Sequence, residues 1–434
     1  MSELLARHRA VIPNWVGIYY DEPIEIVSGQ GCRVTDAQGR SYLDFFAGIL
    51  TNMLGYDVPE VRDAVERQIA SGVVHTSTLY LIRGQVELAE KITRLSGIDN
   101  AKVFFTNSGT EANETALLAA LTARKATEVL AMRGSYHGRS FGAVGVTGNA
   151  AWKMSGLSPF GAHYLHGADR GLAAYAGLSD ADYIKACVDD LRALLSGGIH
   201  PADVGCLLAE PVQGVGGFTM APDGLFAAYK EVLDEHGILL ISDEVQTGWG
   251  RTGEHFWGIG AHGVTPDAMT FAKGLGNGFA IGGVVARGDL LDRIRGNGIS
   301  TFGGNPVATA AGNATLDYVL SHDLQRNAKV TGDLIISGLR EAAQSLDVVG
   351  AVRGKGLMFA VDLVDPATRQ PSPPLASRML EATKERGLLI GKGGLVGHTL
   401  RMAPPLTLTE AEAKEGLGIL TDALTAVNEE ASKP

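Results

Sequence analysis

Asp243 and Glu244 are adjacent carboxylates at the end of the apolar run in ILLISDEVQTGWGRTG, which begins at Ile238. A carboxylate at the end of a buried strand carries a large desolvation cost unless a cation meets it. The candidate partners of Asp243 are a metal ion, an arginine and a protonated ring nitrogen. The metal is disfavoured because no further His or carboxylate follows at ligand spacing. The role of Glu244 stays open, and anchoring of the loop through a cation such as Arg251 is one interpretation.

Lys273 ends a second short apolar run, in PDAMTFAKGLGNGFAIGG, and directly precedes a glycine-rich segment. A partly desolvated lysine loses basicity and can form a Schiff base with an aldehyde cofactor. The alternative is a solvated lysine in a loop. A covalent role for Lys273 is therefore one of two interpretations of this motif.

Two further motifs have the features of phosphate-binding loops. In TNSGTEANET, Ser108 and Gly109 predict a tight turn before a helix that begins near Thr110, where free backbone amides bind anions. In STFGGNPVATAAG, a loop containing Thr301 precedes a predicted helix cap at Asn305. Ordinary helix capping is the favoured interpretation of each motif when it is taken alone.

The motif RGSYHGRS follows the next predicted strand and offers two groups suited to a flat, anionic ligand. Tyr136 can stack on a planar ring, and Arg139 can bind a carboxylate through its guanidinium fork. His137 is more typical of a structural hydrogen-bonding residue than of a catalyst. No second His lies at metal-ligand spacing.

The elements that must position these groups alternate between short apolar runs and helical patterns from about residue 55 to 320. Runs such as KVFFT, VLAMRG, VGCLLAEP and ILLISDE predict strands covered on both faces, and hence an α/β fold with a mostly parallel central sheet. Ligands bind outside the carboxyl ends of such strands. A hairpin pattern over 23–46 with Gly39 in its turn, together with the last hundred residues, predicts a smaller α+β unit. The expected division is 1–54, 55–320 and 321–434.

Composition narrows the class of protein. The 434-residue chain has a net charge of -11 and no Lys/Arg run, which argues against nucleic-acid binding. Cys32, Cys187 and Cys206 lack metal-ligand spacing and indicate reduced thiols. We find no secretion signal and no apolar run long enough for a bilayer, so we expect a cytoplasmic protein that does not enter membranes.

Seven motifs taken together in this order resemble the class III (ω-amino acid) aminotransferases, which use pyridoxal 5'-phosphate (PLP). They are TNSGTEAN, YHGRS, AEPVQG, LLISDEVQTGWGRTG, TFAKGLGNGFAIGG, TFGGNP and LRMAPPLTLT, and they span nearly the whole chain. The resemblance implies PLP-dependent transferase fold type I. GKGGLVGHTLRMAPPLTLT and LDFFAGI are most similar to the alanine-glyoxylate and β-alanine-pyruvate branch.

The resemblance also assigns roles around the cofactor. Lys273 matches the lysine that holds PLP as a Schiff base and carries the proton, and Asp243 matches the partner of the pyridinium nitrogen. Gln246 corresponds to the side chain that contacts the 3'-oxygen of the cofactor. The remaining cofactor-binding positions are Ser108, Gly109 and Thr110 at the phosphate, Thr301 from the other subunit of a dimer, Tyr136 and Val245 on the two ring faces, and Glu210.

The substrate positions implied by the resemblance begin with Glu210 and Arg401. These two match a pair in which the arginine binds an α-carboxylate and the glutamate neutralises the arginine when an ω-amine enters. Arg139 matches an arginine that holds a distal carboxylate in other branches, and Ile49 lies in the segment that lines the pocket.

The implied activity is ping-pong transfer of an amino group from an ω-amino acid, an amine or alanine to a keto acid. Pyruvate or glyoxylate is the preferred acceptor and 2-oxoglutarate a further one, in a homodimer or a tetramer with shared active sites and no metal. A PLP-dependent epimerase, aminomutase or decarboxylase is the alternative. Phe279, where a dinucleotide fingerprint needs its last glycine, argues against a dehydrogenase. A non-enzymatic binding module is a third option.

Overall fold

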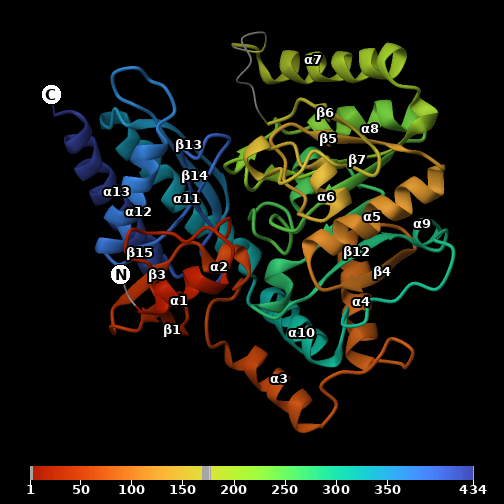
Figure 1. The fold of residues 1–434 in the computed structure, drawn as a ribbon, viewed down its shortest axis with the longest axis horizontal. Helices are drawn as coiled ribbons and strands as arrows, with labels where there is room; N and C mark the ends of the chain where they lie inside the picture. The colour runs from red at the N-terminus through yellow and green to blue at the C-terminus, as the bar shows by residue number, and fades with distance from the viewer. Residues whose placement is uncertain (1–2, 169–174, 176, 434) are drawn as a thin grey trace.

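The computed structural model describes residues 3–168, 175 and 177–433. Figure 1 shows two units side by side. The larger holds the central sheet and helices α3 to α10, and the smaller brings together strands from both ends of the chain. Both termini lie on the side of the smaller unit (Figure 1).

A seven-stranded sheet forms the centre of the larger unit in the described part of the chain. Its strands, in spatial order, are β4 (Ala101–Thr106), β12 (Gly282–Arg287), β11 (Ala268–Phe271), β10 (Leu239–Asp243), β7 (Val204–Ala209), β5 (Glu128–Met132) and β6 (Gly161–Leu165). Only β12 runs antiparallel to its neighbours β4 and β11; the other pairings are parallel. The expected α/β fold with a mostly parallel sheet is therefore confirmed.

The inner strands of this sheet, from β12 to β5, are buried on both faces, as their continuous apolar runs predict. The edge strands β4 and β6 are only partly buried, so the expectation for the run KVFFT in β4 was wrong. Successive side chains point to opposite faces. Along β10, Leu239 and Ile241 belong to one apolar cluster and Leu240 to another. The first cluster also contains α5 (Gly109–Arg124), and the second contains α8 (Leu225–Glu235). Helices thus cover both faces and leave the strand ends as the accessible edges.

The other helices of the larger unit complete these layers. Their bounds are α3 (Pro59–Ala70), α4 (Arg83–Ser96), α6 (Phe141–Val146), α7 (Asp180–Ala193), α9 (Gly288–Leu291) and α10 (Pro306–Ser321). The predicted cap of α10 is confirmed, because the Asn305 side chain accepts a hydrogen bond from the Ala308 amide at 2.9 Å and Pro306 takes the first helical position.

The smaller unit contains two four-stranded sheets. One has the order β13 (Val349–Lys355), β14 (Met358–Leu363), β17 (Thr399–Met402) and β16 (Gly391–Gly393). The other has β1 (Ile26–Gln30), β2 (Arg33–Asp36), β3 (Ser41–Asp44) and β15 (Leu388–Leu389). The predicted hairpin is β2–β3, and its turn contains Gly39 with φ 82°. Because β15 pairs with β3, the two ends of the chain share one sheet.

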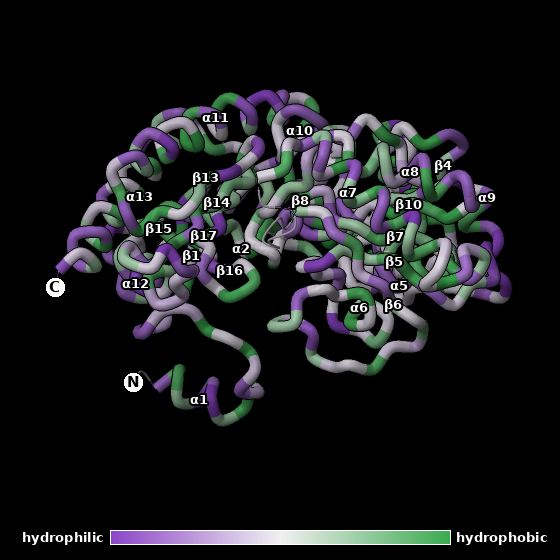
Figure 2. Tube along the Cα trace, turned by 90° about the horizontal axis from the view of Figure 1, so that it is seen from above, coloured by the Kyte–Doolittle hydropathy of each residue, from purple (hydrophilic) through white to green (hydrophobic). Residues whose placement is uncertain are grey.

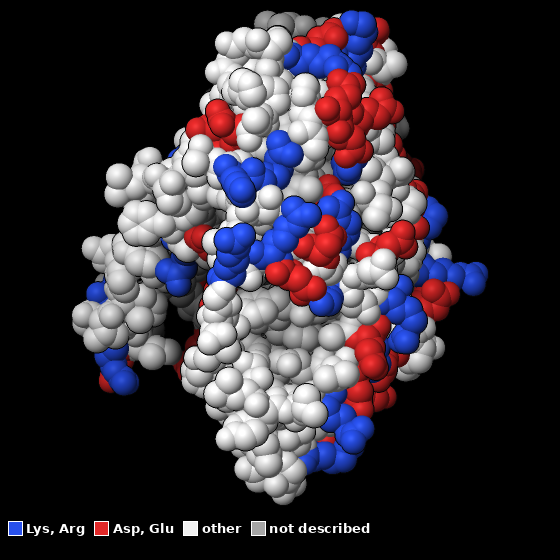
Figure 3. All heavy atoms as spheres, turned by 90° about the vertical axis from the view of Figure 1, so that its right-hand side faces the viewer, with Lys and Arg blue, Asp and Glu red and all other residues white. Residues whose placement is uncertain are grey.

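Helices α11 (Leu324–Ala342), α12 (Pro373–Glu385) and α13 (Glu410–Ala431) pack on this unit, and α2 (Ala47–Leu50) leads from it toward the pocket. The helix α1 (Glu3–Val11) stands apart from the body and has no buried residue (Figure 2). On the face drawn in Figure 3, acidic and basic side chains are interspersed. No helix formed by the described residues is long and apolar enough to cross a membrane.

Candidate active site

A pocket of about 510 Å³ lies where the loops after β4, β5, β7, β10 and β11 converge. These loops leave the carboxyl ends of strands that point the same way, which is where open parallel sheets bind ligands. Segments that join the smaller unit to the larger one also contribute. The lining includes Ile49, Thr51, Asn107, Ser108, Gly109, Thr110, Asn113, Tyr136, His137, Trp152, Glu210, Asp243, Val245, Gln246, Lys273, Phe279 and Arg401.

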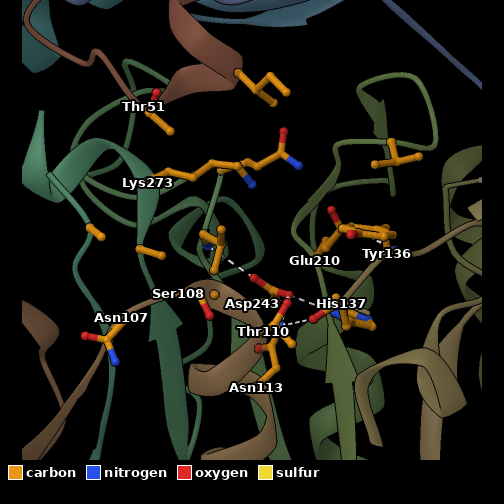
Figure 4. Close-up of a pocket in the computed structure, with 18 of the residues that line it drawn as sticks. Thr51, Asn107, Ser108, Thr110, Asn113, Tyr136, His137, Glu210, Asp243 and Lys273 are labelled. Atoms are coloured by element: carbon orange, nitrogen blue, oxygen red, sulfur yellow. Dashed lines mark hydrogen bonds and ion pairs between the residues drawn. The ribbon is translucent and has the colours of Figure 1, made fainter. Parts of the chain in front are cut away.

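Asp243 is held by three hydrogen-bond donors at the end of β10 (Figure 4). Its Oδ2 lies 2.7 Å from Asn113 Nδ2 and 2.8 Å from His137 Nδ1, and its Oδ1 accepts from the Val245 amide at 3.2 Å. The side chain is 4 % exposed and lines the pocket. Hydrogen bonds of this kind fix a buried carboxylate in one orientation while it keeps accepting capacity toward the pocket.

Asn113 is a neighbour of Asp243 that the sequence analysis missed, and His137 bonds Asp243 as the structural hydrogen-bonding residue that was expected. Asn113 also donates to the His137 carbonyl at 2.8 Å and accepts from the Thr270 hydroxyl at 2.7 Å. One signal was available, since Asn113 lies three and four residues after Thr110 and Gly109 and therefore shares their helix face. No comparable signal marked His137, whose partner Asp243 lies 106 residues away.

Glu244 is held by neutral hydrogen-bond donors and not by a cation. Its carboxylate accepts hydrogen bonds from the amides of Gly258 and Ile259, each at 2.8 Å, and from two nearby hydroxyls, those of Ser242 and Thr247. Arg251 instead donates to the carbonyls of residues 357 and 404. The interpretation that Glu244 anchors its loop through Arg251 is therefore wrong. Neutral donors do the anchoring, because a buried carboxylate needs hydrogen bonds and not necessarily a countercharge.

Lys273 follows β11 and lies opposite Asp243 in the pocket (Figure 4). Its backbone has φ 43°, a left-handed conformation that is uncommon outside glycine and often marks functional sites. Burial lowers the pKa of its amine, and the nearby carboxylates of Asp243 and Glu210 partly oppose this. None of the described residues accepts a hydrogen bond from its Nζ. The solvated-loop interpretation is thus disfavoured.

The first turn of α5 borders the same pocket. Ser108 caps the helix, with its Oγ accepting from the Glu111 amide at 3.2 Å, so the capping interpretation is correct. The cap does not exclude an anion, because Gly109 and Thr110 also line the pocket at the positive end of the helix. In Figure 4, Asn107 and Ser108 lie on one side of Asp243, and Tyr136 and Glu210 on the other.

Glu210 follows β7 and is 5 % exposed. Its carboxylate accepts from the Tyr136 amide at 2.9 Å and from the Gly214 amide at 2.8 Å. Burial is the largest cause that raises its pKa, to about 7, while His137 opposes the rise. Near neutral pH both the neutral and the ionised form of this group are therefore populated. The Tyr136 ring meets the Trp152 ring edge-on at 5.6 Å, and Trp152 is a further lining residue that the sequence analysis missed.

Arg401, on β17, is the second cation of the pocket lining after Lys273. It is 3 % exposed, and its Nη1 donates to the Gly214 carbonyl at 2.9 Å. The rings of Phe46 and Phe218 lie 5.4 and 5.5 Å from its guanidinium carbon. Burial lowers its pKa, but a guanidinium stays charged at neutral pH. It is suited to receive a carboxylate.

Two predicted site residues do not line the pocket of this chain. Arg139 and Thr301 are exposed, and neither borders the cavity. Ile49, by contrast, lines it, with φ 64° in the segment before α3. The structure thus brings together the other predicted positions, from Ser108 to Arg401, around one cavity.

A family model for class-III aminotransferases matches residues 19–424. The chain belongs to the class-III aminotransferases. This membership agrees with the resemblance in the seven motifs, and it shows the chain to be a transaminase. Class-III aminotransferases use pyridoxal 5'-phosphate, which is therefore the cofactor.

Relatives of this class-III aminotransferase carry several substrate names. This chain is 38% identical over 418 residues to an acetylornithine aminotransferase of Caldanaerobacter subterraneus, and the match covers 94% of this chain and 96% of that protein. It is 37% identical over 413 residues to an alanine-glyoxylate aminotransferase 2 homologue, named as mitochondrial, of Arabidopsis thaliana, covering 94% and 84%. A solved phospholyase from Arthrobacter, in complex with phosphoethanolamine, has a TM-score of 0.87 at 35% identity and covers 100% of both chains.

The residues present fit the cofactor of this class. Gln246 lies beside Asp243, and its buried Oε1 has no hydrogen-bond partner among the described residues, as expected of an atom that awaits a ligand. A Cβ on Gly109 would lie 2.9 Å from Val245, so a side chain there would crowd the wall of the pocket. A half-buried amine, a fixed carboxylate and a helix N-terminus therefore surround one cavity.

Proposed function

We propose that this aminotransferase takes its amino group from an ω-amino acid, an amine or alanine, and passes it to pyruvate or glyoxylate in a ping-pong reaction. 2-Oxoglutarate is a further acceptor. The observation that carries the proposal is the shared pocket of Lys273, Asp243 and Arg401, which combines a nucleophilic amine, a fixed negative charge and a carboxylate receptor.

Lys273 is the residue that holds the cofactor and moves the proton. Its lowered pKa increases the fraction of neutral amine, which is the nucleophilic and proton-accepting form. When bound, PLP supplies an electron-withdrawing ring that stabilises negative charge at the substrate carbon. Asp243, fixed by Asn113 and His137, keeps a proton on the ring nitrogen through its negative charge.

The lining of the pocket supports the other cofactor-binding positions. Ser108, Gly109 and Thr110 would present a helix N-terminus to the phosphate, and Gln246 would contact the 3'-oxygen. Tyr136 and Val245 would hold the ring between them. Glu210 would neutralise Arg401 when an ω-amine enters, and in its neutral form it would leave Arg401 to bind an α-carboxylate.

The acceptor preference rests on the distribution of cations. Arg401 and Lys273 are the pocket cations among the described residues, whereas Arg139 is exposed outside the lining. One carboxylate receptor matches pyruvate or glyoxylate, which have one carboxylate. 2-Oxoglutarate has two, so it requires Arg139 to turn inward. The preferred acceptors are therefore the short monocarboxylates.

A homodimer with shared active sites is part of this proposal. Segments 73–85 and 299–305 lie side by side, with His75 and Phe302 rings 4.9 Å apart and Gln85 bonded to the Gly304 carbonyl at 3.1 Å. Leu81 there is 97% exposed and Phe302 60%. An exposed apolar area of this kind favours a second copy of the chain, to which Thr301 would then be delivered.

Mixing two inactive variants tests the shared site. A Lys273→Ala subunit paired with a Thr301→Ala subunit contains one site in which both residues are intact, so the mixed dimer regains activity above either parent. Light scattering measures the assembly, including a tetramer. A monomer, or no gain on mixing after subunit exchange, contradicts the shared site.

We also assign the enzyme to the cytoplasm. Cys32, Cys187 and Cys206 are buried and form no disulfide among the described residues, which agrees with a reducing compartment. Fractionation of cells that express the tagged chain tests this assignment. Recovery of the enzyme with an organelle or the envelope contradicts it.

A second outcome on the same machinery is favoured by one comparison. The similar Arthrobacter structure is a phospholyase, and phosphoethanolamine carries a phosphate in place of a carboxylate. Arg401 could pair with either anion. Release of phosphate from phosphoethanolamine without a keto acid would assign this elimination to the chain. Racemisation or decarboxylation of a donor would instead assign the epimerase or decarboxylase outcome.

A panel of donors and acceptors tests the transaminase directly. The donors are β-alanine, 4-aminobutyrate, ornithine, alanine and an arylamine, each crossed with pyruvate, glyoxylate and 2-oxoglutarate. We expect a donor alone to remove the absorbance of the lysine-bound cofactor, and pyruvate or glyoxylate to restore it. Restoration by 2-oxoglutarate alone would contradict the acceptor preference. Persistence of the absorbance with every donor would contradict transamination by this chain.

A further inference from the structure

The turn from Gly214 to Phe218 supports Arg401 from behind. The Gly214 carbonyl accepts a hydrogen bond from Arg401 Nη1 at 2.9 Å, and the amide of Gly217 returns to the same carbonyl at 3.1 Å. The ring of Phe218, which is fully buried, lies 5.5 Å from the guanidinium carbon. The position of Arg401 therefore depends on the conformation of this turn.

The backbone of this turn adopts a conformation that bulky residues rarely adopt. Phe218 has φ 51°, a left-handed conformation that is rare for a bulky side chain, and Gly217 has φ 105°. A Cβ on Gly217 would lie 3.0 Å from Thr399 and 3.2 Å from Arg353. Such a conformation persists only where the surrounding structure holds it.

Arg353, on β13, holds the turn from the smaller unit. Its Nη2 donates to the Gly217 carbonyl at 2.6 Å, and its Nε lies 3.2 Å from the Phe218 carbonyl. Asp362, on β14, faces the same guanidinium, with Oδ1 at 2.8 Å from Nη2, and accepts from the Thr399 hydroxyl at 2.6 Å. The planar fork thus joins one carboxylate to two carbonyls, a geometry that the point charge of a lysine reproduces only in part.

We propose that Arg353 and Asp362 are positioning residues that set the orientation of Arg401 through the 214–218 turn, and thereby the selectivity of the enzyme for substrates with a carboxylate. This inference rests on the proposed role of Arg401 as the carboxylate receptor. Neither Arg353 nor Asp362 lines the pocket, so both act on the substrate indirectly. Arg353 does so through the turn, and Asp362 does so through Arg353 and through Thr399 on β17, the strand of Arg401. The smaller unit then determines which substrates the larger unit processes.

Two donors that differ only by the carboxylate provide the first test. Alanine and isopropylamine are each mixed with the holoenzyme, and the absorbance of the lysine-bound cofactor is followed against donor concentration. Arg353→Gln should raise the half-saturating concentration of alanine by about tenfold, a size reached by residues that act through a neighbour. The limiting rates, and the response to isopropylamine, should change by less than about twofold. Asp362→Asn should act in the same direction, and Arg353→Lys should recover part of the loss.

Titration of propanoate into the holoenzyme by calorimetry provides the second test, and it needs no reaction. Arg353→Gln should weaken propanoate binding by the same factor as it weakens alanine. Arg378→Gln is the matched control, because Arg378 forms a bidentate pair with Glu430 between α12 and α13 of the smaller unit and does not approach the turn. This variant should bind propanoate as the wild type does.

The possible outcomes separate the two proposals. If Arg401→Gln leaves propanoate binding unchanged, the receptor role of Arg401 is wrong. If Arg401→Gln weakens binding while folded, cofactor-loaded Arg353→Gln and Asp362→Asn do not, the positioning inference alone is wrong. Equal losses for alanine and isopropylamine would also overturn it, since they would indicate general damage to the site.

Discussion

The adjacent carboxylates Asp243 and Glu244 at the end of β10 lie in different surroundings, one on the pocket side and the other on the back side. On the pocket side, Asp243 is oriented by Asn113 and His137 and still borders the cavity. On the back side, Glu244 is enclosed by two backbone amides and two hydroxyls, and it does not border the cavity. Adjacent residues of the same charge thus have different surroundings, because successive positions after a strand face different parts of the fold.

This difference teaches how a charge can be assigned to chemistry or to structure. A carboxylate whose acceptors are saturated by protein donors is a structural anchor, whereas one that keeps an accessible acceptor can act on a ligand. The comparison predicts that changes on the pocket side reduce catalysis, and that changes on the back side reduce stability. Three substitutions test this division, and a fourth tests the raised pKa of the pocket residue Glu210.

Lys273→Ala should have the largest effect. Removal of the amine eliminates both the attachment of the cofactor and the proton carrier, so the transamination rate should fall by at least ~10³-fold. The thermal midpoint of the cofactor-free protein should change little, since no described residue bonds to Nζ. Steady-state rates and calorimetric unfolding measure the two quantities. Activity at the wild-type level would show that the pocket does not perform the reaction.

Asp243→Asn should follow, with a rate loss of about 10²-fold or more, because the amide carries no charge to keep the ring nitrogen protonated. The amide oxygen still accepts from Asn113 and His137, and the new NH₂ group faces only the Val245 amide, whose bond to Asp243 is long at 3.2 Å. The unfolding free energy should therefore fall less than for Glu244→Gln, where the amide contacts are 2.8 Å long. Single-turnover rates with saturating donor are the measurement. A variant that unfolds readily yet turns over normally when folded would reverse the division between the two sides.

Glu244→Gln is the matched change on the back side. An NH₂ group replaces one acceptor oxygen and faces an amide donor of residue 258 or 259, which should cost about 1–3 kcal/mol of unfolding free energy. The rate of the folded, cofactor-loaded variant should stay near that of the wild type. Denaturant titration beside single-turnover kinetics compares it with Asp243→Asn. A large rate loss without loss of stability would move Glu244 to the pocket side.

Glu210→Gln should give the smallest effect, which is a change in how steeply the unfolding free energy depends on pH. Burial raises the pKa of Glu210 from 4.5 to about 7, so between these values the folded protein retains a proton that the unfolded chain has lost. The contribution of Glu210 to the unfolding free energy therefore declines as pH rises through this window. Denaturant titrations of the cofactor-free protein should show a flatter pH dependence for the variant. Parallel curves would contradict the raised pKa.

The sequence was informative where a local pattern determines position. Strand ends followed by polar residues placed Lys273, Asp243 and Ser108 at one edge of the sheet, because parallel strands end on the same side. Asn305 and Gly39 were identified by their capping and turn chemistry. The positions of Arg139 and Thr301 stay predictions, since neither lines the pocket of a single chain.

The sequence misled where charge was the available guide. The positive charge of Arg251 made it the expected partner of Glu244, but the actual donors include the neutral amides of residues 258 and 259. Because nearly every residue has a backbone amide, the residue types in a sequence do not show which amides will bond a buried carboxylate. The interpretation of His137 as a structural hydrogen-bonding residue agrees with its bond to Asp243, but only the tertiary structure reveals that partner.

The sequence by itself determined the fold class, the family and the residues that can do the chemistry, because apolar periodicity and short motifs are properties of neighbouring residues. Only the tertiary structure decided which carboxylate faces the pocket, which groups hold Asp243, and how Arg353 reaches the turn behind Arg401. These contacts join residues more than a hundred positions apart. Packing of whole elements sets such distances, and no local pattern records them.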